Sequence, residues 1–110
     1  MSFNVLRDPF VGLHNHSEMS NLTLRDCTIK IKDAILYVAN ELGQTSFALT
    51  DHETTSNSLK YLSAVKELKE SGKIPQSFKP ILGNEIYLVD EQELKTKLNN
   101  KEKVDFYHFI

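Results

Sequence analysis

The chain has 110 residues, which is one small domain at most, and its 40% hydrophobic and 25% charged residues are ordinary for a soluble globular protein. A formal net charge of −2 argues against a stand-alone nucleic-acid-binding protein, because such proteins carry a strong basic excess. No stretch approaches the ~20 apolar residues that span a bilayer, and the single cysteine cannot form an internal disulfide, so we expect a protein of the reducing cytoplasm without membrane association.

Short apolar strands alternate with helices along the chain. Apolar residues between 30 and 42 fall on one face of a helix, and Gly43 follows where a C-cap belongs. Ser56 can cap a second helix. In the first part of the chain, the sequence predicts a strand over 10–13, a helix over 30–42, a strand over 46–50 and a helix closed by Gly72. A loop over 73–79 leads to a strand region over 81–89, which is interrupted near Gly83. A polar helix over 91–99 and the start of a fourth strand over 104–110 follow.

This alternation predicts an α/β fold with parallel strands joined by right-handed crossovers. Parallel sheets bury both faces, so three or four strands make an incomplete fold. Residues 106–110 form a predicted apolar strand with nothing after it. We therefore expect a truncated piece of a larger domain, whose open sheet edge favours self-association.

Residues able to bind metal recur where the predicted strands end. An H-x-H pair on an extended segment places both imidazoles on one side, and a carboxylate such as Glu85 can bridge two ions. Imidazole and carboxylate ligands suit zinc, manganese or iron, and two ions ~4 Å apart can activate a water for attack on a phosphoester. The candidates are His14 and His16 after the first strand, Asp51 and His52 after the second, Glu85 in the third and His108 in the fourth.

Each of these features has a structural alternative when taken alone. An isolated H-x-H pair is a weak signal, Asp51 can cap a helix, and His108 can be a satisfied core residue. Glu85 is harder to explain without a partner, because an unpaired buried carboxylate is costly. The recurrence at four successive strands favours a metal site in the parent domain. Lysines 95, 97, 101 and 103 alternate with glutamates, which favours a solvated helix face over a DNA contact.

Four segments carry a resemblance to a known family. Residues 14–20 (HNHSEMS) resemble the first motif of PHP metallophosphoesterases, H-x-H-S-x-x-S, and residues 48–52 (ALTDH) resemble the second, the T-D-H element. Residues 80–87 (PILGNEIY) are similar to the G-x-E-x-Y strand of bacterial DNA polymerase III alpha subunits. Residues 107–110 (YHFI) resemble the start of the H-h-h-h-L strand that follows.

The resemblance implies that residues 1–110 are the N-terminal part of a PHP domain, with the first three to four strand–helix units of a distorted seven-stranded β/α barrel. Such a domain has a cleft for up to three divalent ions, which could be zinc, manganese or iron. The resemblance implies metal-ligand roles for His14, His16, His52, Glu85 and His108.

Three further residues receive expectations of their own. Asp26 is similar to the family's acidic ligand after the first turn, although a loop carboxylate is an equal alternative. Asp51 is the candidate catalytic residue, acting by orienting His52 or fixing the loop rather than by binding metal. Cys27 is expected to be a small buried residue and not a nucleophile.

The resemblance implies a parent protein that is a replicative DNA polymerase, acting with DNA and other replisome subunits. Its PHP domain would be either a metal-dependent phosphoesterase or a structural platform. In the first case, a 3′–5′ proofreading exonuclease is one form that the activity could take. The later PHP motifs, which supply further ligands, are absent, so we expect the fragment alone to be inactive. Two alternatives stay open: a stand-alone phosphoesterase similar to histidinol-phosphate phosphatases, and a non-catalytic scaffold module.

Overall fold

Three parallel strands form the sheet on which the candidate site is built. The structure is a computed structural model that describes residues 9–22 and 27–110. Strands β1 (Gly12–Asn15), β2 (Ser46–Leu49) and β3 (Lys79–Leu82) lie in the order β1-β2-β3, and both pairings are parallel. The central strand β2 is buried at all four positions, as expected for a strand between two neighbours and covered by helices. The predicted α/β fold with a parallel sheet is confirmed for these strands.

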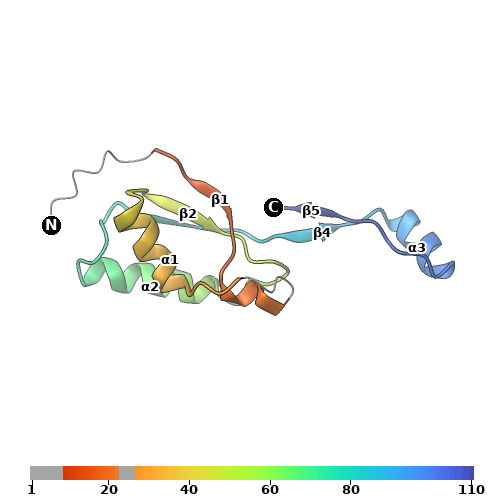
Figure 1. Cartoon of the computed structure of the whole chain (residues 1–110), viewed down its shortest axis with the longest axis horizontal. Helices are drawn as coiled ribbons and strands as arrows, with labels where there is room; N and C mark the ends of the chain where they lie inside the picture. Colours follow the sequence, from red (N-terminus) through yellow and green to blue (C-terminus); the bar gives the residue numbers. More distant parts are fainter. Residues whose placement is uncertain (1–8, 23–26) are drawn as a thin grey trace.

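Two helical segments cover the sheet (Figure 1). Helix α1 (Ile31–Leu36) continues into a π-helical turn, η2 (Tyr37–Glu41), so the predicted helix over 30–42 is confirmed. Gly43 follows with a positive φ of 66°, which suits a glycine after a helix. Helix α2 (Ser58–Glu70) is followed by Gly72, with a φ of 69°.

One hydrophobic cluster joins these layers. Phe47 and Leu49 are two residues apart on β2 and therefore point to the same face of the sheet, where they contact buried side chains of α1 and α2. The hydroxyl of Tyr61 donates to the carbonyl of Phe47 at 2.8 Å, which satisfies the polar end of this buried ring. The cluster consists of Ile31, Ile35, Ala39, Phe47, Leu49, Tyr61, Ala64, Val65, Leu68, Ile74 and Phe78.

The fourth strand differs from its prediction. Strands β4 (Ile86–Leu88) and β5 (Tyr107–Phe109) form a separate antiparallel ribbon, so the expectation that all strands are parallel is wrong for β5. The connecting helix α3 (Glu91–Asn99) buries no side chain, and its only apolar residues are Leu94 and Leu98. So narrow an apolar face cannot cover a sheet as a crossover helix does, and the chain instead returns beside β4.

The β4–β5 ribbon and α3 project from the body of the molecule, which consists of the three-stranded sheet with α1 and α2 (Figure 1). The molecule measures 62 × 24 × 21 Å along its principal axes. On α3, Lys95 pairs with Glu91 at 2.6 Å, and Lys97 pairs with Glu93 at 2.8 Å. These pairs agree with the solvated helix face predicted from the charge pattern.

Two local features also differ from the predictions. Helix α2 begins after Asn57, and Ser56 lies instead in a turn where its backbone N–H donates to the hydroxyl of Thr54 at 3.1 Å. A short 3-10 helix, η1 (Glu18–Leu22), follows the H-x-H segment and was not predicted. Among the described residues, no helix has the length and apolar character needed to cross a membrane.

Candidate metal centre

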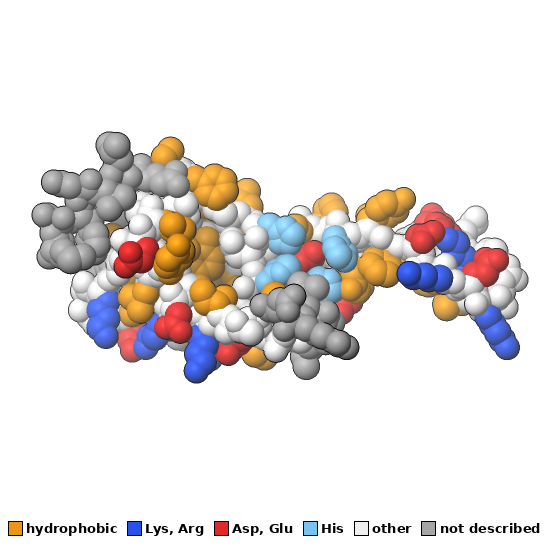
Figure 2. All heavy atoms as spheres, in the orientation of Figure 1, with side chains coloured by type: hydrophobic (Ala, Val, Ile, Leu, Met, Phe, Trp, Pro, Cys, Tyr) orange, Lys and Arg blue, Asp and Glu red, His pale blue; other side chains and the backbone are white. Residues whose placement is uncertain are grey.

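All four histidines of the chain gather around Glu85, where the body meets the ribbon (Figure 2). His14 belongs to β1 and His16 follows it, while His52 follows β2. Glu85 lies between β3 and β4, and His108 comes from the middle of β5. The carboxyl ends of the parallel strands therefore supply four of the five side chains, as expected for a functional site on an α/β sheet.

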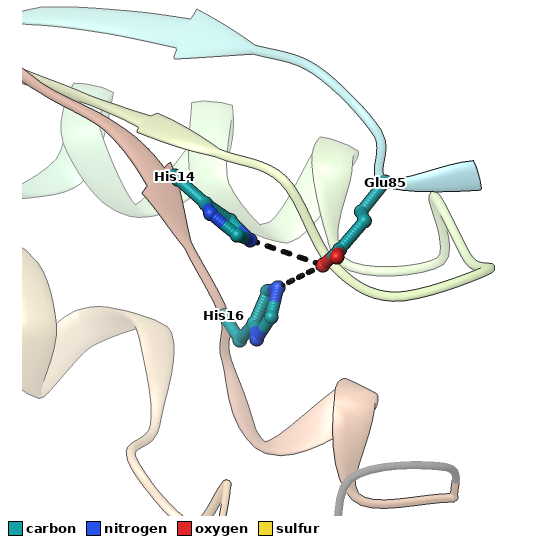
Figure 3. A group of neighbouring side chains, drawn as sticks. All are labelled: His14, His16 and Glu85. Carbon is teal, nitrogen blue, oxygen red and sulfur yellow. Dashed lines mark hydrogen bonds and ion pairs between the residues drawn. The ribbon is translucent and has the colours of Figure 1, made fainter. Parts of the chain in front are cut away.

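Glu85 presents its two carboxylate oxygens to different histidines. Oε2 lies 3.1 Å from Nε2 of His14 and 2.5 Å from Nε2 of His16, and the two rings point towards it from the same segment (Figure 3). Oε1 lies 3.2 Å from Nδ1 of His108. The side chain of Glu85 is only 3% exposed, so these contacts take the place of solvent around a buried carboxylate.

His52 completes the centre from the opposite side. Its ring is buried, and its centroid lies 6.3 Å from that of His16 and 5.2 Å from that of His108. The backbone around it is paired with Glu85: the Glu53 N–H donates to the Glu85 carbonyl at 2.9 Å, and the Glu85 N–H donates to the Asp51 carbonyl at 3.2 Å. This short parallel bridge fixes the distance between the second motif and the carboxylate.

Within the described residues, these side chains form two groups with the composition of a metal site. His14, His16 and Glu85 make one group, and His52, Glu85 and His108 make the other. The ligand atoms of each group lie within 4.8 Å of one another, and Glu85 is common to both. Imidazole nitrogens with a carboxylate are suitable ligands for divalent ions such as zinc, manganese or iron. The donor set therefore fits the ions that the sequence predicts, with Glu85 between the two groups.

The charge state of Glu85 suits this role. Burial alone would raise the pKa of its carboxyl group, but hydrogen bonds and charges of His14 and His16 outweigh it and hold the pKa below its ordinary value. The carboxylate form, which is the form that binds a cation, is thereby favoured.

Asp51 belongs to neither ligand group. Its buried carboxylate accepts the backbone N–H of Ser17 at 2.5 Å, the hydroxyl of Ser17 at 2.7 Å and the hydroxyl of Ser20 at 2.9 Å. The Asn57 side chain donates to the hydroxyl of Ser17, and the His52 N–H donates to that of Ser20, both at 2.8 Å. Asp51 thus ties the turn after His16 to the segment that carries His52.

Comparison with known proteins decides the family. Residues 12–110 match the PHP domain. The chain belongs to the PHP family. It is 41% identical over 101 residues to the Bacillus subtilis protein named "Probable DNA polymerase YorL" and, with the same figures, to a "DNA-directed DNA polymerase" of Bacillus phage SPbeta. It is 35% identical over 88 residues to the "DNA polymerase III subunit alpha" of Campylobacter jejuni.

These matches cover most of this chain but little of the relatives. They span 91% of the chain and 8% of the Bacillus subtilis protein and of the phage protein, and 80% of the chain and 6% of the Campylobacter protein. No solved structure gives a significant match. The likeness to polymerases is therefore a likeness to their PHP region.

Tyr87 lies beside the candidate centre, although no role was predicted for it from the sequence. Its ring centroid lies 5.0 Å from that of His52 and 5.2 Å from that of His108. Burial, followed by the nearby carboxylates of Glu53 and Glu85, raises the pKa of its phenol. The G-x-E-x-Y spacing could have predicted that Tyr87 lies near the ligands, because residues two apart on an extended segment share a face and Glu85 is two residues before Tyr87.

Two predicted residues near the first PHP motif remain outside this geometry. Asp26 lies outside the described residues. Cys27 is half-buried, and its Sγ lies 4.0 Å from Nδ1 of His16, the ring nitrogen that faces away from Glu85. It is thus a neighbour of the site and less buried than expected.

Proposed function

We propose that residues 1–110 are the N-terminal part of the PHP domain of a DNA polymerase related to the polymerase III alpha subunits. We propose further that this domain is a metal-dependent phosphoesterase. The observation that carries the proposal is the position of Glu85, whose two carboxylate oxygens face different histidines of two ligand groups. A buried carboxylate in this position is suited to bridging two divalent ions.

The residues divide into ligands and a positioning group. His14 and His16 would hold an ion on one side of Glu85, and His52 and His108 would hold one on the other. Divalent ions bound there would supply the Lewis-acid chemistry that activates water and stabilises the leaving oxygen of a phosphoester. Asp51 would act through Ser17 and Ser20 by holding the ligand segments in register, which is a positioning role.

The complete domain is proposed to be a distorted seven-stranded β/α barrel, of which β1, β2 and β3 are the first strands. The chain spans 8% of its Bacillus relatives, so the remaining ligands for up to three ions would lie in the longer protein. In this proposal the 110-residue chain binds metal more weakly than the intact domain and does not hydrolyse phosphoesters efficiently. The relatives' names, which contain the words DNA polymerase, support DNA as a partner of the intact protein. Replisome subunits as partners and the cytoplasm as location are further parts of the proposal.

The first test is metal binding by the chain itself. Calorimetric titration with manganese or zinc should give a stoichiometric complex that Glu85→Gln abolishes and that Glu91→Gln, an exposed change on α3, leaves intact. Absence of bound metal in the wild type, with His14 and His16 replaceable by alanine at no cost to folding, would support a scaffold module instead.

The second test addresses the substrate and uses the intact parent protein. Manganese-dependent release of nucleotides from DNA ends, abolished by Glu85→Gln, would support the exonuclease proposal. Release of phosphate from small monoesters without any activity on DNA would favour a phosphoesterase of the histidinol-phosphatase kind.

A further inference from the structure

The ribbon beyond the metal centre has two different faces. In its antiparallel register, Tyr87 lies opposite His108. Because side chains alternate along extended chain, Glu85, which directly precedes β4, shares one face of the ribbon with Tyr87, and Phe106, which directly precedes β5, shares this face with His108. Each segment thus brings one metal-binding side chain and one aromatic ring to this face. The opposite face carries Ile86, Leu88, Tyr107 and Phe109.

Tyr87 and Phe106 form a pair of rings directly next to the candidate centre. Their centroids lie 4.2 Å apart, and Phe106 lies 5.9 Å from His108 in a stacked arrangement. The two side chains are nevertheless 38% and 46% exposed. Partly exposed rings that contact each other and adjoin ligand side chains can receive a planar aromatic ligand by stacking or edge contact.

We propose that Tyr87 and Phe106 bind the base of a nucleotide whose phosphate lies at the histidine–Glu85 centre, a proposal that rests on the function proposed above. Base and phosphate of one nucleotide are joined through a single sugar, and the ring pair directly adjoins the centre, so one nucleotide can occupy both. Stacking on aromatic side chains is independent of sequence, because every base has a π-face. The subsite would therefore select nucleotides over other phosphate esters without selecting among bases.

The charges near the ribbon favour recognition of a nucleotide by base stacking over recognition of a phosphate backbone by a row of basic side chains. Lys97 is paired with both Glu93 and Asp105, and Lys95 is paired with Glu91. The chain as a whole carries a net charge of −2. Recognition of nucleic acid along this face would then come from the rings, and the phosphate would be held at the metal centre.

Nuclear magnetic resonance titration of the zinc-loaded 110-residue chain tests the proposal. The ligands are deoxyadenosine 5′-monophosphate, 2-deoxyribose 5-phosphate and uncharged deoxyadenosine. We expect the nucleotide to bind roughly ten- to a hundred-fold more tightly than the sugar phosphate, as base stacking on an aromatic residue typically gives. Ring-current shifts should appear on Tyr87 and Phe106 and not on Tyr107, which lies on the opposite face.

Variants sharpen the assignment. Tyr87→Ala or Phe106→Ala should bring the nucleotide to the affinity of the sugar phosphate, while Tyr87→Phe keeps the ring and the preference. Tyr107→Ala, at a side chain that is 74% exposed, is the matched control and should keep it too. Zinc titrated into each variant separates loss of the base subsite from loss of the centre.

The outcomes distinguish the two proposals. Equal affinity for nucleotide and sugar phosphate, with zinc bound, would overturn the base subsite and leave the metal centre standing. Failure to bind zinc or sugar phosphate, with deoxyadenosine still shifting Tyr87 and Phe106, would support the subsite and contradict the metal centre. No shift with any ligand would overturn the subsite.

Discussion

Ser17 donates both its backbone N–H and its hydroxyl to the carboxylate of Asp51, at 2.5 and 2.7 Å. Ser17 is next to His16, and Asp51 is next to His52, so this contact joins two segments that supply histidines to the candidate centre. A buried charge satisfied by several donors holds its surroundings in one geometry. We therefore propose that Asp51 acts on the site by positioning the backbone segments that carry His16 and His52.

Replacing Asp51 by asparagine should weaken both stability and metal binding. The amide keeps the volume but loses the charge, and it presents one N–H₂ group to donors. Hydrogen bonds to charged groups are worth about 1.5–3 kcal/mol, so we expect a loss of roughly 3 kcal/mol in the free energy of unfolding. Urea denaturation measures it. Asp33→Asn, at an exposed side chain of α1, is the control. A loss below about 0.5 kcal/mol, the usual range for a surface change, would refute this role for Asp51.

Gly83→Ala should strain the junction between β3 and Glu85. A Cβ at this position would lie 2.9 Å from Cγ2 of Thr50, a buried side chain that is fixed by hydrogen bonds to the backbone of Asn15. Overpacking of this kind costs typically 1–3 kcal/mol. Thr50→Ser removes Cγ2 and keeps the hydroxyl, so the double variant should recover most of the stability lost in thermal denaturation. A double variant no more stable than Gly83→Ala alone would show that this contact is not the cause.

The metal-free chain should lose stability in acid partly through Glu85. Its pKa in the folded state lies below the ordinary value of 4.5, because the contacts of His14 and His16 outweigh burial. The folded state therefore gains stability from this carboxylate above about pH 4.5 and loses it as the pH falls through the folded pKa. Glu85→Gln should show a shallower decrease in unfolding free energy over that window. Parallel curves for the two proteins would contradict the expectation.

The chain should self-associate. Among residues 9–22 and 27–110, β1 and β3 are the outer strands of the sheet and have no further strand beside them. The ribbon face formed by Ile86, Leu88, Tyr107 and Phe109 is exposed at every one of these positions. Sedimentation velocity at micromolar concentration should show dimers or larger species, and Tyr107→Lys should shift the distribution towards monomer. A single monomeric species for the wild type would refute self-association.

The sequence predicted the parallel sheet and the helix over 30–42 well, because hydrophobic periodicity and glycine positions determine them locally, and it also predicted the polar helix over 91–99. It placed Glu85 among the site residues because a buried carboxylate in an apolar strand needs a partner. His108 was included through the recurrence of metal-capable residues at successive strands and the resemblance to the PHP motifs. The antiparallel direction of β5 could not be predicted from local sequence patterns. It depends on α3 not packing against a sheet, which is a property of contacts between distant segments. The role of Ser20 was missed for a related reason, because its hydroxyl meets Asp51 only after the chain has folded.

Crystals grown with manganese and measured at its absorption edge would show whether Glu85 lies between two metal ions. We expect anomalous density next to Glu85, with one ion on the side of His14 and His16 and a second on the side of His52 and His108. Crystals of Glu85→Gln grown in the same way should lack this density. Ordered manganese elsewhere in the wild-type crystals, with none in contact with Glu85, would refute a metal centre at this carboxylate.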